Sequence, residues 1–360
     1  MNKKKILKRV LKISLCILLS LVLIVVSYLG YVIFSYKRIA DNQTLTPSKN
    51  GSNTALSLNT SYTAVIQNLG FGAYTQDFTF FMDGGTQSWA NSKESVIECI
   101  NKGADTVAKY NPDFIMFQEI DFDSIRSYRT NQREMLQNRF KNHCSVFAVN
   151  YDSAFLAYPF TQPHGASNSG LLTLSKFNIE SAKRRSLPIS KGFGKFLDLD
   201  RCYSVSRIPV ENGKELLLYN VHLSAYGSSD EIRTAQMTML FNDIKSEYEK
   251  GNYIVCGGDY NHDFTGDSTQ KLNGGQEVEF GWAKPFPQEL LPECITRCID
   301  YDELVPTCRN CDIPYKKGNL TFIVDGFLVS KNVEAVTVRN IETEFVFSDH
   351  NPVVLEFKLK

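Results

Sequence analysis

The sequence predicts an α/β domain over residues 62–360 that follows one N-terminal transmembrane helix. Three observations support this prediction. A run of 24 residues without a charge lies near the start of the chain, short apolar runs of strand length recur after residue 62, and amphipathic stretches separate some of them. Because no internal repeat and no Pro/Gly-rich linker interrupts residues 62–360, we expect a single domain with sheets inside and helices outside.

The composition favours a folded protein with an acidic body. Of the 360 residues, 43% are hydrophobic and 22% are charged, which excludes a largely disordered, collagen-like or coiled-coil protein. The formal net charge is zero, but residues 1–38 contain eight Lys or Arg residues and no acid. The rest of the chain therefore has 31 basic and 39 acidic residues, a net charge of −8. Such a body has no general attraction for nucleic acid.

The first predicted element is a membrane anchor at residues 13–36. These residues carry no charge, and a helix needs about 20 apolar residues to cross a bilayer. A cleaved signal peptide is the alternative, but it would have a shorter apolar region followed by a small-residue cleavage site. Residues 1–12 contain six basic residues, so the positive-inside rule makes them a cytoplasmic tail. We therefore expect a single-pass protein of the cell membrane with an extracytoplasmic body.

The next segment, residues 37–61, is rich in Ser, Thr and Asn and has no periodicity. This composition predicts a flexible tether between the anchor and the domain.

The domain itself begins near Tyr62. Its predicted strands are seven apolar runs at residues 63–69, 113–120, 169–175, 215–223, 252–259, 320–330 and 351–359. Its two clearest predicted helices place apolar residues on one face over residues 92–110 and 231–248.

Polar side chains recur where these strands end. They are Asn68, Glu119, Asn220, His222, Asp259, Asn261, Asp325, Asp349 and His350. Polar groups at the ends of apolar strands meet at one edge of a sheet, where ligands bind. The set offers carboxylate and amide oxygens and no cysteine, which favours Mg²⁺ or Mn²⁺ over zinc.

In their order along the chain, six motifs resemble those of the endonuclease/exonuclease/phosphatase superfamily, the DNase I-like proteins. They are Gln67-Asn68, Gln118-Glu119, Asn220-Val221-His222-Leu223, Gly258-Asp259-Tyr260-Asn261, Val324-Asp325 and Ser348-Asp349-His350. The resemblance covers about residues 62–359 and implies a four-layer sandwich of two mixed β-sheets flanked by helices. It also implies Mg²⁺-dependent hydrolysis of a phosphodiester or phosphomonoester by in-line attack of water, which would make residues 62–360 a catalytic domain.

The same resemblance implies a metal site. Glu119 would be the principal ligand, Asn68 would support it, and Asp349 would approach the metal or orient it. One carboxylate and one amide oxygen leave coordination positions for water and phosphate, which suits Mg²⁺, with Mn²⁺ as a substitute.

The resemblance also implies catalytic roles for five residues. His350 and Asp325 would form a hydrogen-bonded pair in which the carboxylate stabilises the charged imidazole. Asp259 would orient or deprotonate the attacking water, and Asn261 would hold a phosphate oxygen. His222 would protonate the leaving oxygen or stabilise charge on phosphorus.

Other residues near these motifs have structural explanations. Arg233 and Gln236 are expected to tie their helix to the domain. His262, Asp263 and Asp267 could add a second ion, although a solvated loop is the simpler interpretation.

Four clustered cysteines leave three alternatives open. Cys294, Cys298, Cys308 and Cys311 could form disulfides in an extracytoplasmic body, bind a structural metal, or stay free thiols.

The substrate depends on loops around the shared site. Two aromatic segments, residues 71–89 and 151–169, could stack on bases or sugars, dip into lipid headgroups, or form core under a long loop. The acidic body and the anchor favour a small-molecule or lipid-headgroup phosphoester outside the cell. An anchored extracytoplasmic nuclease is the alternative, with nucleic acid as a partner that is not favoured. A catalytically silent binding protein is a further alternative.

Overall fold

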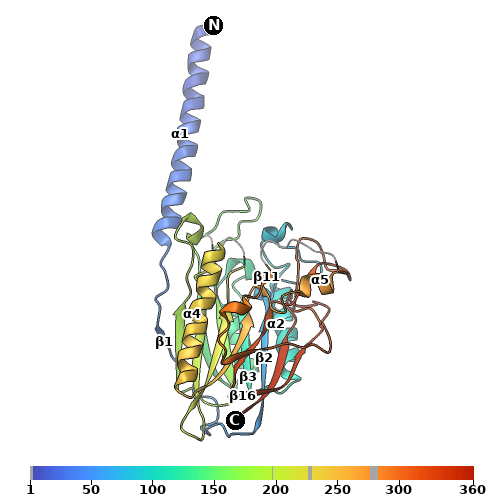
Figure 1. Ribbon diagram of the computed structural model, residues 1–360. Helices are drawn as coiled ribbons and strands as arrows, with labels where there is room; N and C mark the ends of the chain where they lie inside the picture. Colours follow the sequence, from blue (N-terminus) through green and yellow to red (C-terminus); the bar gives the residue numbers. More distant parts are fainter. Residues whose placement is uncertain (1–2, 197, 226–228, 276–282) are drawn as a thin grey trace.

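The computed structural model describes residues 3–196, 198–225, 229–275 and 283–360. Two sheets pack face to face inside the domain, helices cover their outer faces, and α1 (Lys3–Ser35) projects away from the domain (Figure 1).

Seven strands form the first sheet. In spatial order they are β1 (Gln43–Leu45), β6 (Ser181–Ser186), β7 (Cys202–Pro209), β8 (Glu215–His222), β9 (Tyr253–Asp259), β15 (Asp325–Ser330) and β12 (Ile295–Cys298). Six strands form the second sheet: β16 (Val333–Asn340), β17 (Val353–Leu359), β2 (Ser61–Asn68), β3 (Phe114–Asp121), β5 (Asn168–Ser175) and β4 (Cys144–Asp152). Both sheets are mixed, because β8 with β9 and β2 with β3 are parallel pairs among antiparallel ones.

The remaining elements are short or lie on the outside. Two small ladders pair β10 (His262–Asp263) with β11 (Lys284–Pro285) and β13 (Cys308–Arg309) with β14 (Thr321–Phe322). The other α-helices are α2 (Lys93–Ala108), α3 (Gln132–Arg139), α4 (Asp230–Glu249) and α5 (Ser268–Leu272). Short 3₁₀ turns are η1 (Gly70–Gly72), η2 (Phe81–Asp83), η3 (Ile125–Ser127), η4 (Phe193–Phe196) and η5 (Gln288–Leu290).

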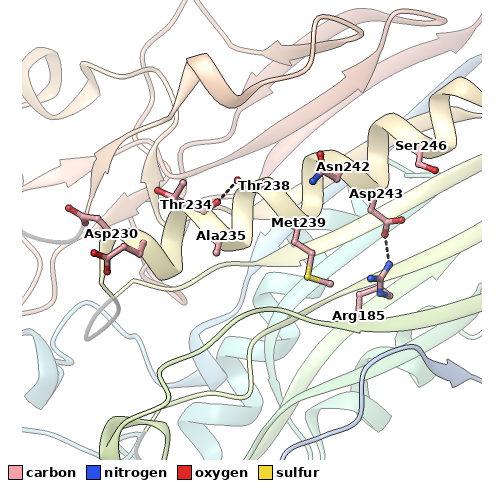
Figure 2. Close-up of a pocket in the computed structure, with 10 residues that line it drawn as sticks. Arg185, Asp230, Thr234, Ala235, Thr238, Met239, Asn242, Asp243 and Ser246 are labelled. Atoms are coloured by element: carbon pink, nitrogen blue, oxygen red, sulfur yellow. Dashed lines mark hydrogen bonds and ion pairs between the residues drawn. The ribbon is translucent and has the colours of Figure 1, made fainter.

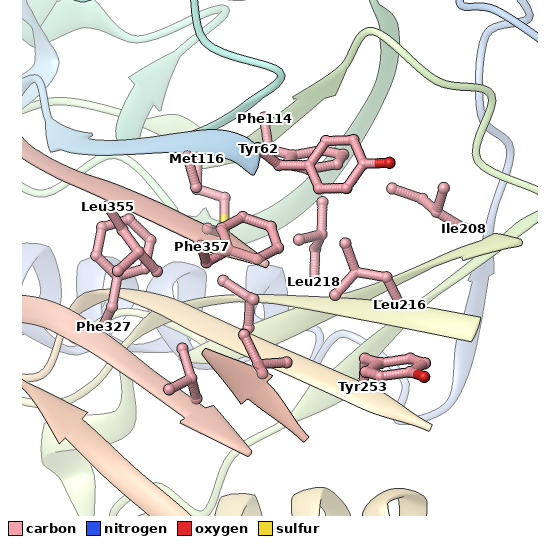
Figure 3. Packing of buried hydrophobic residues seen from close by; sticks show 14 of the residues in the cluster. Tyr62, Phe114, Met116, Ile208, Leu216, Leu218, Tyr253, Phe327, Leu355 and Phe357 are labelled. Atoms are coloured by element: carbon pink, nitrogen blue, oxygen red, sulfur yellow. The ribbon is translucent and has the colours of Figure 1, made fainter. Parts of the chain in front are cut away.

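Alternating strand residues build three apolar layers. Ile66, Leu218 and Phe357 belong to the central core. Figure 3 shows Leu218 and Phe357 in the space between the sheets. The neighbouring Val65 packs outward in the cluster that includes α2, and Leu217 does so in the cluster that includes α4. This alternation follows from the two-residue period of a strand. The predicted four-layer sandwich is confirmed.

Local sequence signals explain where the main helices begin. Ser92 precedes α2 and its side chain accepts a hydrogen bond from the amide of Ser95, while Ser229 does the same for Ile232 at α4. These caps satisfy amides that have no partner within the helix. Both predicted helices are confirmed with nearly the same bounds.

All seven predicted apolar runs contain strands, but the run at 320–330 is divided between two of them. Its first part is β14, which pairs with β13, and its second part begins β15 at Asp325. Several strands were not predicted. β4 and β7 are mostly buried but mix polar with apolar residues, and two others are polar or exposed. The edge strand β16 is mostly exposed, and β6 contains the sequence Lys-Arg-Arg.

The segment at residues 37–61 differs from the flexible tether that its composition predicts. β1 adds to the first sheet beside β6, the amide of Ser52 donates to the carbonyl of Lys176 at 2.7 Å, and Leu56 is fully buried. Backbone pairing and one buried leucine outweigh the polar composition here. The chain between the helix and Tyr62 therefore lies along the domain.

The predicted anchor forms α1, a helix of 33 residues that is long and apolar enough to span a membrane by length and composition. The residues that follow its C-terminal end are attached to the domain. Tyr36 donates a hydrogen bond of 2.9 Å to the buried carboxylate of Asp200, and Arg38 pairs with the same carboxylate at 2.6 Å. These contacts hold the helix and the domain in one orientation.

Candidate active site

The sheet topology brings the predicted residues together. The parallel pairs β2/β3 and β8/β9 end at the same edge of the sandwich, which places Asn68, Glu119, His222 and Asp259 there. β15 and β17 run antiparallel to β9 and β2, so the starts of these strands reach that edge too. They supply Asp325 and, just before β17, Asp349 and His350.

A cavity of about 320 Å³ opens at this edge. It is lined by six of the eight predicted site residues: Glu119, His222, Asp259, Asn261, Asp349 and His350. The other two, Asn68 and Asp325, lie behind the lining and bond to residues that form it. The structure therefore brings all eight into one site.

Glu119 reaches the cavity from a distorted position in β3. The pairing of β3 with β5 shifts register between Phe117 and Ile120, and Glu119 has a φ of 55°. A bulge of this kind turns a side chain away from the regular alternation of the strand. A left-handed backbone at a residue other than glycine costs about 1–3 kcal/mol, and such strain is typical of functional sites.

Asn68 supports the carboxylates in this arrangement. Its amide nitrogen donates to Glu119 at 3.2 Å and to Asp259 at 3.1 Å, while its oxygen accepts from the amide of Gly70 at 2.9 Å. The predicted supporting role fits these contacts. The Asn68 oxygen accepts this one hydrogen bond from Gly70 and keeps a second lone pair, so its predicted role as a ligand stays a prediction.

Gly70 allows the chain to pass close to Asp349. Its φ is +51°, and a β-carbon there would lie 2.6 Å from an Asp349 oxygen and 2.4 Å from the ring of Tyr74. Only glycine fits both the backbone conformation and the space.

His350 and Asp325 form a buried pair. Nδ1 of His350 lies 2.8 Å from Oδ2 of Asp325, and Nε2 lies 3.9 Å from carboxylate oxygens of both Asp259 and Asp349. Burial alone would lower the pKa of His350, but Asp325 and the nearby acids raise it well above the usual value. The imidazole is therefore positively charged at neutral pH, as the sequence predicts for this pair.

Two carboxyl groups in the site have unusual pKa values. Burial, with the neighbouring Asp325, raises the pKa of Asp259 to about 7 against the opposing charge of His350. Burial and the nearby Glu119 raise the pKa of Asp349 to about 7, although the positive charge of His350 acts to lower it. Once ionised, these buried carboxylates lack sufficient neutralising charge, which favours a bound cation.

The residues fit a divalent metal of the kind the sequence predicts. One grouping, Asp259, Asp325 and His350, has ligand atoms within 4.8 Å of one another. However, Nδ1 of His350 is bonded to Asp325 and the ring is charged, and a protonated imidazole does not ligate a metal. The carboxylates of Glu119 and Asp349 are the better ligands, because they face the same cavity and offer hard oxygen donors.

We expect Mg²⁺ to raise the melting temperature more at about pH 8 than at about pH 5.5. The pKa values of Asp259 and Asp349 in the folded protein exceed the value of about 3.9 in the unfolded chain. Protonation of these two carboxyl groups therefore stabilises the fold, and this contribution is fully present below about pH 3.9. This contribution to stability is lost as the pH rises through about 7, because both carboxyl groups then ionise and repel each other. A bound cation would remove that repulsion. Thermal unfolding with Mg²⁺ or EDTA measures the shift. An equal shift at both pH values would contradict this assignment.

His222 is neutral in this environment. Burial, followed by the charges of Arg201, His350 and Arg126, lowers its pKa well below the usual value. Nε2 of His222 lies 3.7 Å from Asp259 and 3.9 Å from Glu119, and the buried Nδ1 has no hydrogen-bond partner. A neutral imidazole suits hydrogen bonding to phosphate better than proton donation from a charged ring.

Asn261 is fixed by the loop after β9. Its backbone N–H donates a hydrogen bond of 2.9 Å to the Asp259 carboxylate, and its side-chain nitrogen donates one of 2.8 Å to the carbonyl of Leu223. One side-chain N–H is left for the cavity. Arg233 donates to the Asn261 carbonyl and Gln236 to the Pro188 carbonyl, each at 2.7 Å, so their predicted role in tying α4 to the domain is confirmed.

Sequence reasoning missed three buried arginines that line the cavity: Arg126, Arg201 and Arg309. Arg126 makes two hydrogen bonds to Asp121 and lies 3.9 Å over the ring of Phe71. The Nε atoms of Arg201 and Arg309 have no hydrogen-bond partner. Guanidinium groups suit phosphate oxygens, but these three lie outside the strand-end pattern that identified the other residues.

The residues after Asn261 do not form a solvated loop. His262 and Asp263 are buried, and the carboxylate of Asp263 accepts hydrogen bonds from Thr265, Gly266, Ser268 and Thr269. It organises the turn before α5. Asp267 pairs with Lys271 at 2.8 Å near the surface, so these three residues show no second ion site.

The nine cysteines all lie in described parts of the chain and are unpaired. Cys294, Cys298 and Cys311 pack in three different apolar clusters, which separates these three from one another and argues against a metal shared by all four cysteines. Cys308 lines the cavity, with Sγ 3.6 Å from Nε2 of His350. Burial raises its pKa to about 12, so it is a neutral thiol rather than a nucleophile.

Another hollow follows the outer face of α4 (Figure 2). Its volume, about 960 Å³, is larger than that of the cavity at the strand ends, and its lining includes the ion pair of Arg185 with Asp243 at 3.1 Å. None of the predicted site residues lines it. The cavity at the strand ends is therefore the candidate active site.

Comparisons with known proteins agree with this architecture. The sequence profile of the Endonuclease/Exonuclease/phosphatase family matches residues 101–350. No curated protein sequence matches the chain.

Solved structures share the fold at low sequence identity. An endonuclease/exonuclease/phosphatase from Beutenbergia cavernae is 14% identical with a TM-score of 0.56, over 83% of this chain and 72% of that one. ANGEL2, a 2′,3′-cyclic phosphatase in complex with adenosine-2′,3′-vanadate, is 14% identical with a TM-score of 0.54, over 88% and 98%. The human Nocturnin catalytic domain with bound sulfate is 15% identical with a TM-score of 0.51, over 83% and 95%. With a family profile that covers most of the chain and a matching fold, this protein belongs to the endonuclease/exonuclease/phosphatase family.

Proposed function

We propose that the protein is a divalent-metal-dependent phosphoesterase that acts at the outer surface of the cell membrane. One observation carries the proposal. Three carboxylates, from Glu119, Asp259 and Asp349, face the same cavity as a charged His350 and three buried arginines. The cavity thus offers adjacent groups for a cation and for a phosphate. The fold is shared with ANGEL2, which is a phosphatase of 2′,3′-cyclic phosphates.

Asp259 is the residue that would act on the attacking water. It is held by hydrogen bonds from Asn68 and from the Asn261 amide, and its pKa is near neutrality. A base with such a pKa can accept a proton at physiological pH. Water would give one proton to Asp259 as its oxygen forms a bond to phosphorus and the bond to the leaving oxygen breaks. The leaving oxygen would take its proton from solvent water.

Three other residues would stabilise the phosphate. The imidazolium of His350, oriented by Asp325, faces the growing negative charge. Asn261 and the neutral His222 each offer an N–H to phosphate oxygens. A cation held by Glu119 and Asp349 would neutralise charge on a phosphate oxygen.

We propose that α1 spans the cell membrane with the catalytic domain outside, because six basic residues precede the apolar run. A membrane-impermeant maleimide should then label Lys141→Cys in intact cells and label Lys5→Cys only after permeabilisation. Both positions are exposed, which makes them a matched pair. The reverse pattern, or release of a domain shortened by about 30–40 residues, would reject this topology.

Activity is tested with the full chain in detergent micelles. Substrates are p-nitrophenyl phosphate, bis(p-nitrophenyl) phosphate, phospholipid in mixed micelles and plasmid DNA, each with Mg²⁺, Mn²⁺ or EDTA. We expect hydrolysis of at least one ester that Mg²⁺ or Mn²⁺ supports and EDTA abolishes. Rapid cleavage of plasmid DNA in preference to the small esters would assign a nuclease instead. Absence of any cation-dependent turnover would identify a silent binding protein.

A further inference from the structure

A second cavity, of about 490 Å³, lies beside the catalytic one, between the outer end of α1 and the segment at residues 155–160. We call it the tail cavity. It is lined by Tyr28, Leu29, Val32, Phe81, Met82, Tyr151, Leu156, Ala157, Tyr158, Phe160, His164 and Phe193. None of these side chains is an acid, a lysine or an arginine. Burial, together with the charge of Arg126, lowers the pKa of His164 to about 3, so its ring is neutral as well.

The tail cavity adjoins the catalytic cavity. Met82, Tyr151 and His164 line both. A molecule with a phosphate and an apolar part can therefore place the phosphate among the site residues and the apolar part in the tail cavity.

Hydrogen bonds fix α1 against the wall of the tail cavity. The hydroxyl of Tyr28 donates to the carbonyl of Phe155 at 3.1 Å and accepts from the amide of Ala157 at 2.8 Å. The amide of Phe155 donates to the hydroxyl of Tyr31 at 3.1 Å. Val32 is only 2% exposed between these contacts. The cavity is thus a built feature of the junction between helix and domain.

The junction lies at the level of the predicted membrane surface. About 20 helical residues, at about 1.5 Å each, span the ~30 Å hydrocarbon layer, and counting from Ile13 this stretch ends near Val32. Tyr31 then lies at the edge of the hydrocarbon layer and Tyr28 about 6 Å inside it, next to the interfacial zone where aromatic residues are enriched. The tail cavity therefore lies where acyl chains meet headgroups.

Exposed aromatic side chains surround the cavity at this level. Tyr158 is 63% exposed and Phe160 is 84% exposed. Large apolar side chains rarely gather on a water-facing surface without a partner. In contrast, the aromatic residues of the loop at 71–89 are mainly core, because Phe71, Tyr74, Phe78 and Phe80 are buried. Of the two aromatic segments, the second supplies the strongly exposed aromatic side chains of the rim, and the first adds Phe81 and the half-exposed Met82.

We infer that the tail cavity binds a hydrocarbon chain of a membrane phospholipid while the phosphate of that lipid lies in the catalytic cavity. The inference rests on the proposed phosphoesterase function and adds the substrate class, an amphiphilic phosphoester taken directly from the outer leaflet. A sugar phosphate has no apolar part to fill this space, and a nucleobase, although it can stack on aromatic rings, would bury its polar edges against a lining without a charged side chain. The fixed helix also keeps the catalytic opening at the bilayer surface.

Two esters that differ only in their chain test this inference. They are p-nitrophenyl hexadecyl phosphate and p-nitrophenyl methyl phosphate, which share a leaving group, assayed with the full chain in mixed micelles. We expect kcat/KM to favour the hexadecyl ester by about ten-fold or more. Micelles concentrate the hexadecyl ester by themselves, so the decisive quantity is how this preference changes in variants.

Two variants fill the tail cavity from opposite walls. Leu29→Trp adds bulk from α1, and Ala157→Phe adds it from the domain. Each should reduce the chain preference about ten-fold. Leu23→Trp makes the same substitution at a lipid-facing position that is 66% exposed and outside the cavity, and it should keep the preference. Thermal unfolding of each variant shows whether the fold is retained.

The outcomes separate the inference from the proposed function. Turnover of both esters with a preference that neither cavity variant changes would overturn tail binding and leave the phosphoesterase proposal intact. A change of oligomeric state in Leu29→Trp without loss of preference would make the cavity an interface between copies, which also overturns the inference. No cation-dependent turnover of either ester would reject the proposed function itself.

Discussion

Glu119→Gln is expected to reduce Mg²⁺-dependent phosphoester hydrolysis on the order of 10³-fold or more while the domain stays folded. Glutamine keeps the shape of the side chain and loses the charge that a hard cation requires. Glu119 faces the cavity from a bulge with a φ of 55°, a conformation that the substitution does not relieve. The structure thus maintains a strained backbone at the residue best placed to bind the metal.

The melting temperature provides an independent readout of this substitution. Removing one of three neighbouring negative charges should leave the variant at least as stable as wild type in EDTA, and it should weaken the stabilisation by Mg²⁺. Glu98→Gln, on the exposed side of α2, is the matched control because it removes the same charge outside the site. Near wild-type turnover of Glu119→Gln with Mg²⁺ would show that the metal is held elsewhere.

The sequence predicted most of this site because the site follows from strand topology. Residues such as Asn68, Glu119 and Asp259 end apolar strands, and strands that run together deliver their ends to one edge. The order of the motifs along the chain also predicted Asp325 at the start of β15, and Asp349 and His350 just before β17. The first signal is local in sequence, and the second is the resemblance to the family, which is carried by the order of six motifs from Gln67 to His350; neither requires knowledge of tertiary contacts.

Other features depend on contacts between distant segments, which a single sequence does not show. Arg201 reaches the cavity from just before β7 and Arg309 from the two-residue strand β13, and their burial results from the surrounding fold. The stretch at 43–58 has the composition of a linker, yet it pairs with β6 and buries Leu56. The docking of Tyr36 and Arg38 on Asp200 joins residues about 160 positions apart. Local propensity carries no signal for such pairs.

His350→Ala is expected to reduce turnover on the order of 10³-fold or more, Asp325→Ala somewhat less, and the double variant scarcely more than His350→Ala alone. The two side chains share a hydrogen bond of 2.8 Å, and both are buried, with exposures of 6% and 2%. Asp325 raises the pKa of His350 against the effect of burial. Residues that act through one group have non-additive effects, because removal of the imidazole leaves the carboxylate nothing to support.

Asp325→Asn separates a positioning role from a purely structural one. It keeps the side-chain shape at a position where Oδ1 has no hydrogen-bond partner, but it removes the charge that holds His350 protonated. The pKa of His350, followed by NMR of the imidazole nitrogens, should fall in this variant, and the range of pH over which the enzyme is active should change with it. If Asp325 had only a structural role, Asp325→Asn would lower the melting temperature and leave the pKa of His350 unchanged. Rate losses that multiply in the double variant, as for independent sites, would show that the pair does not act as one unit.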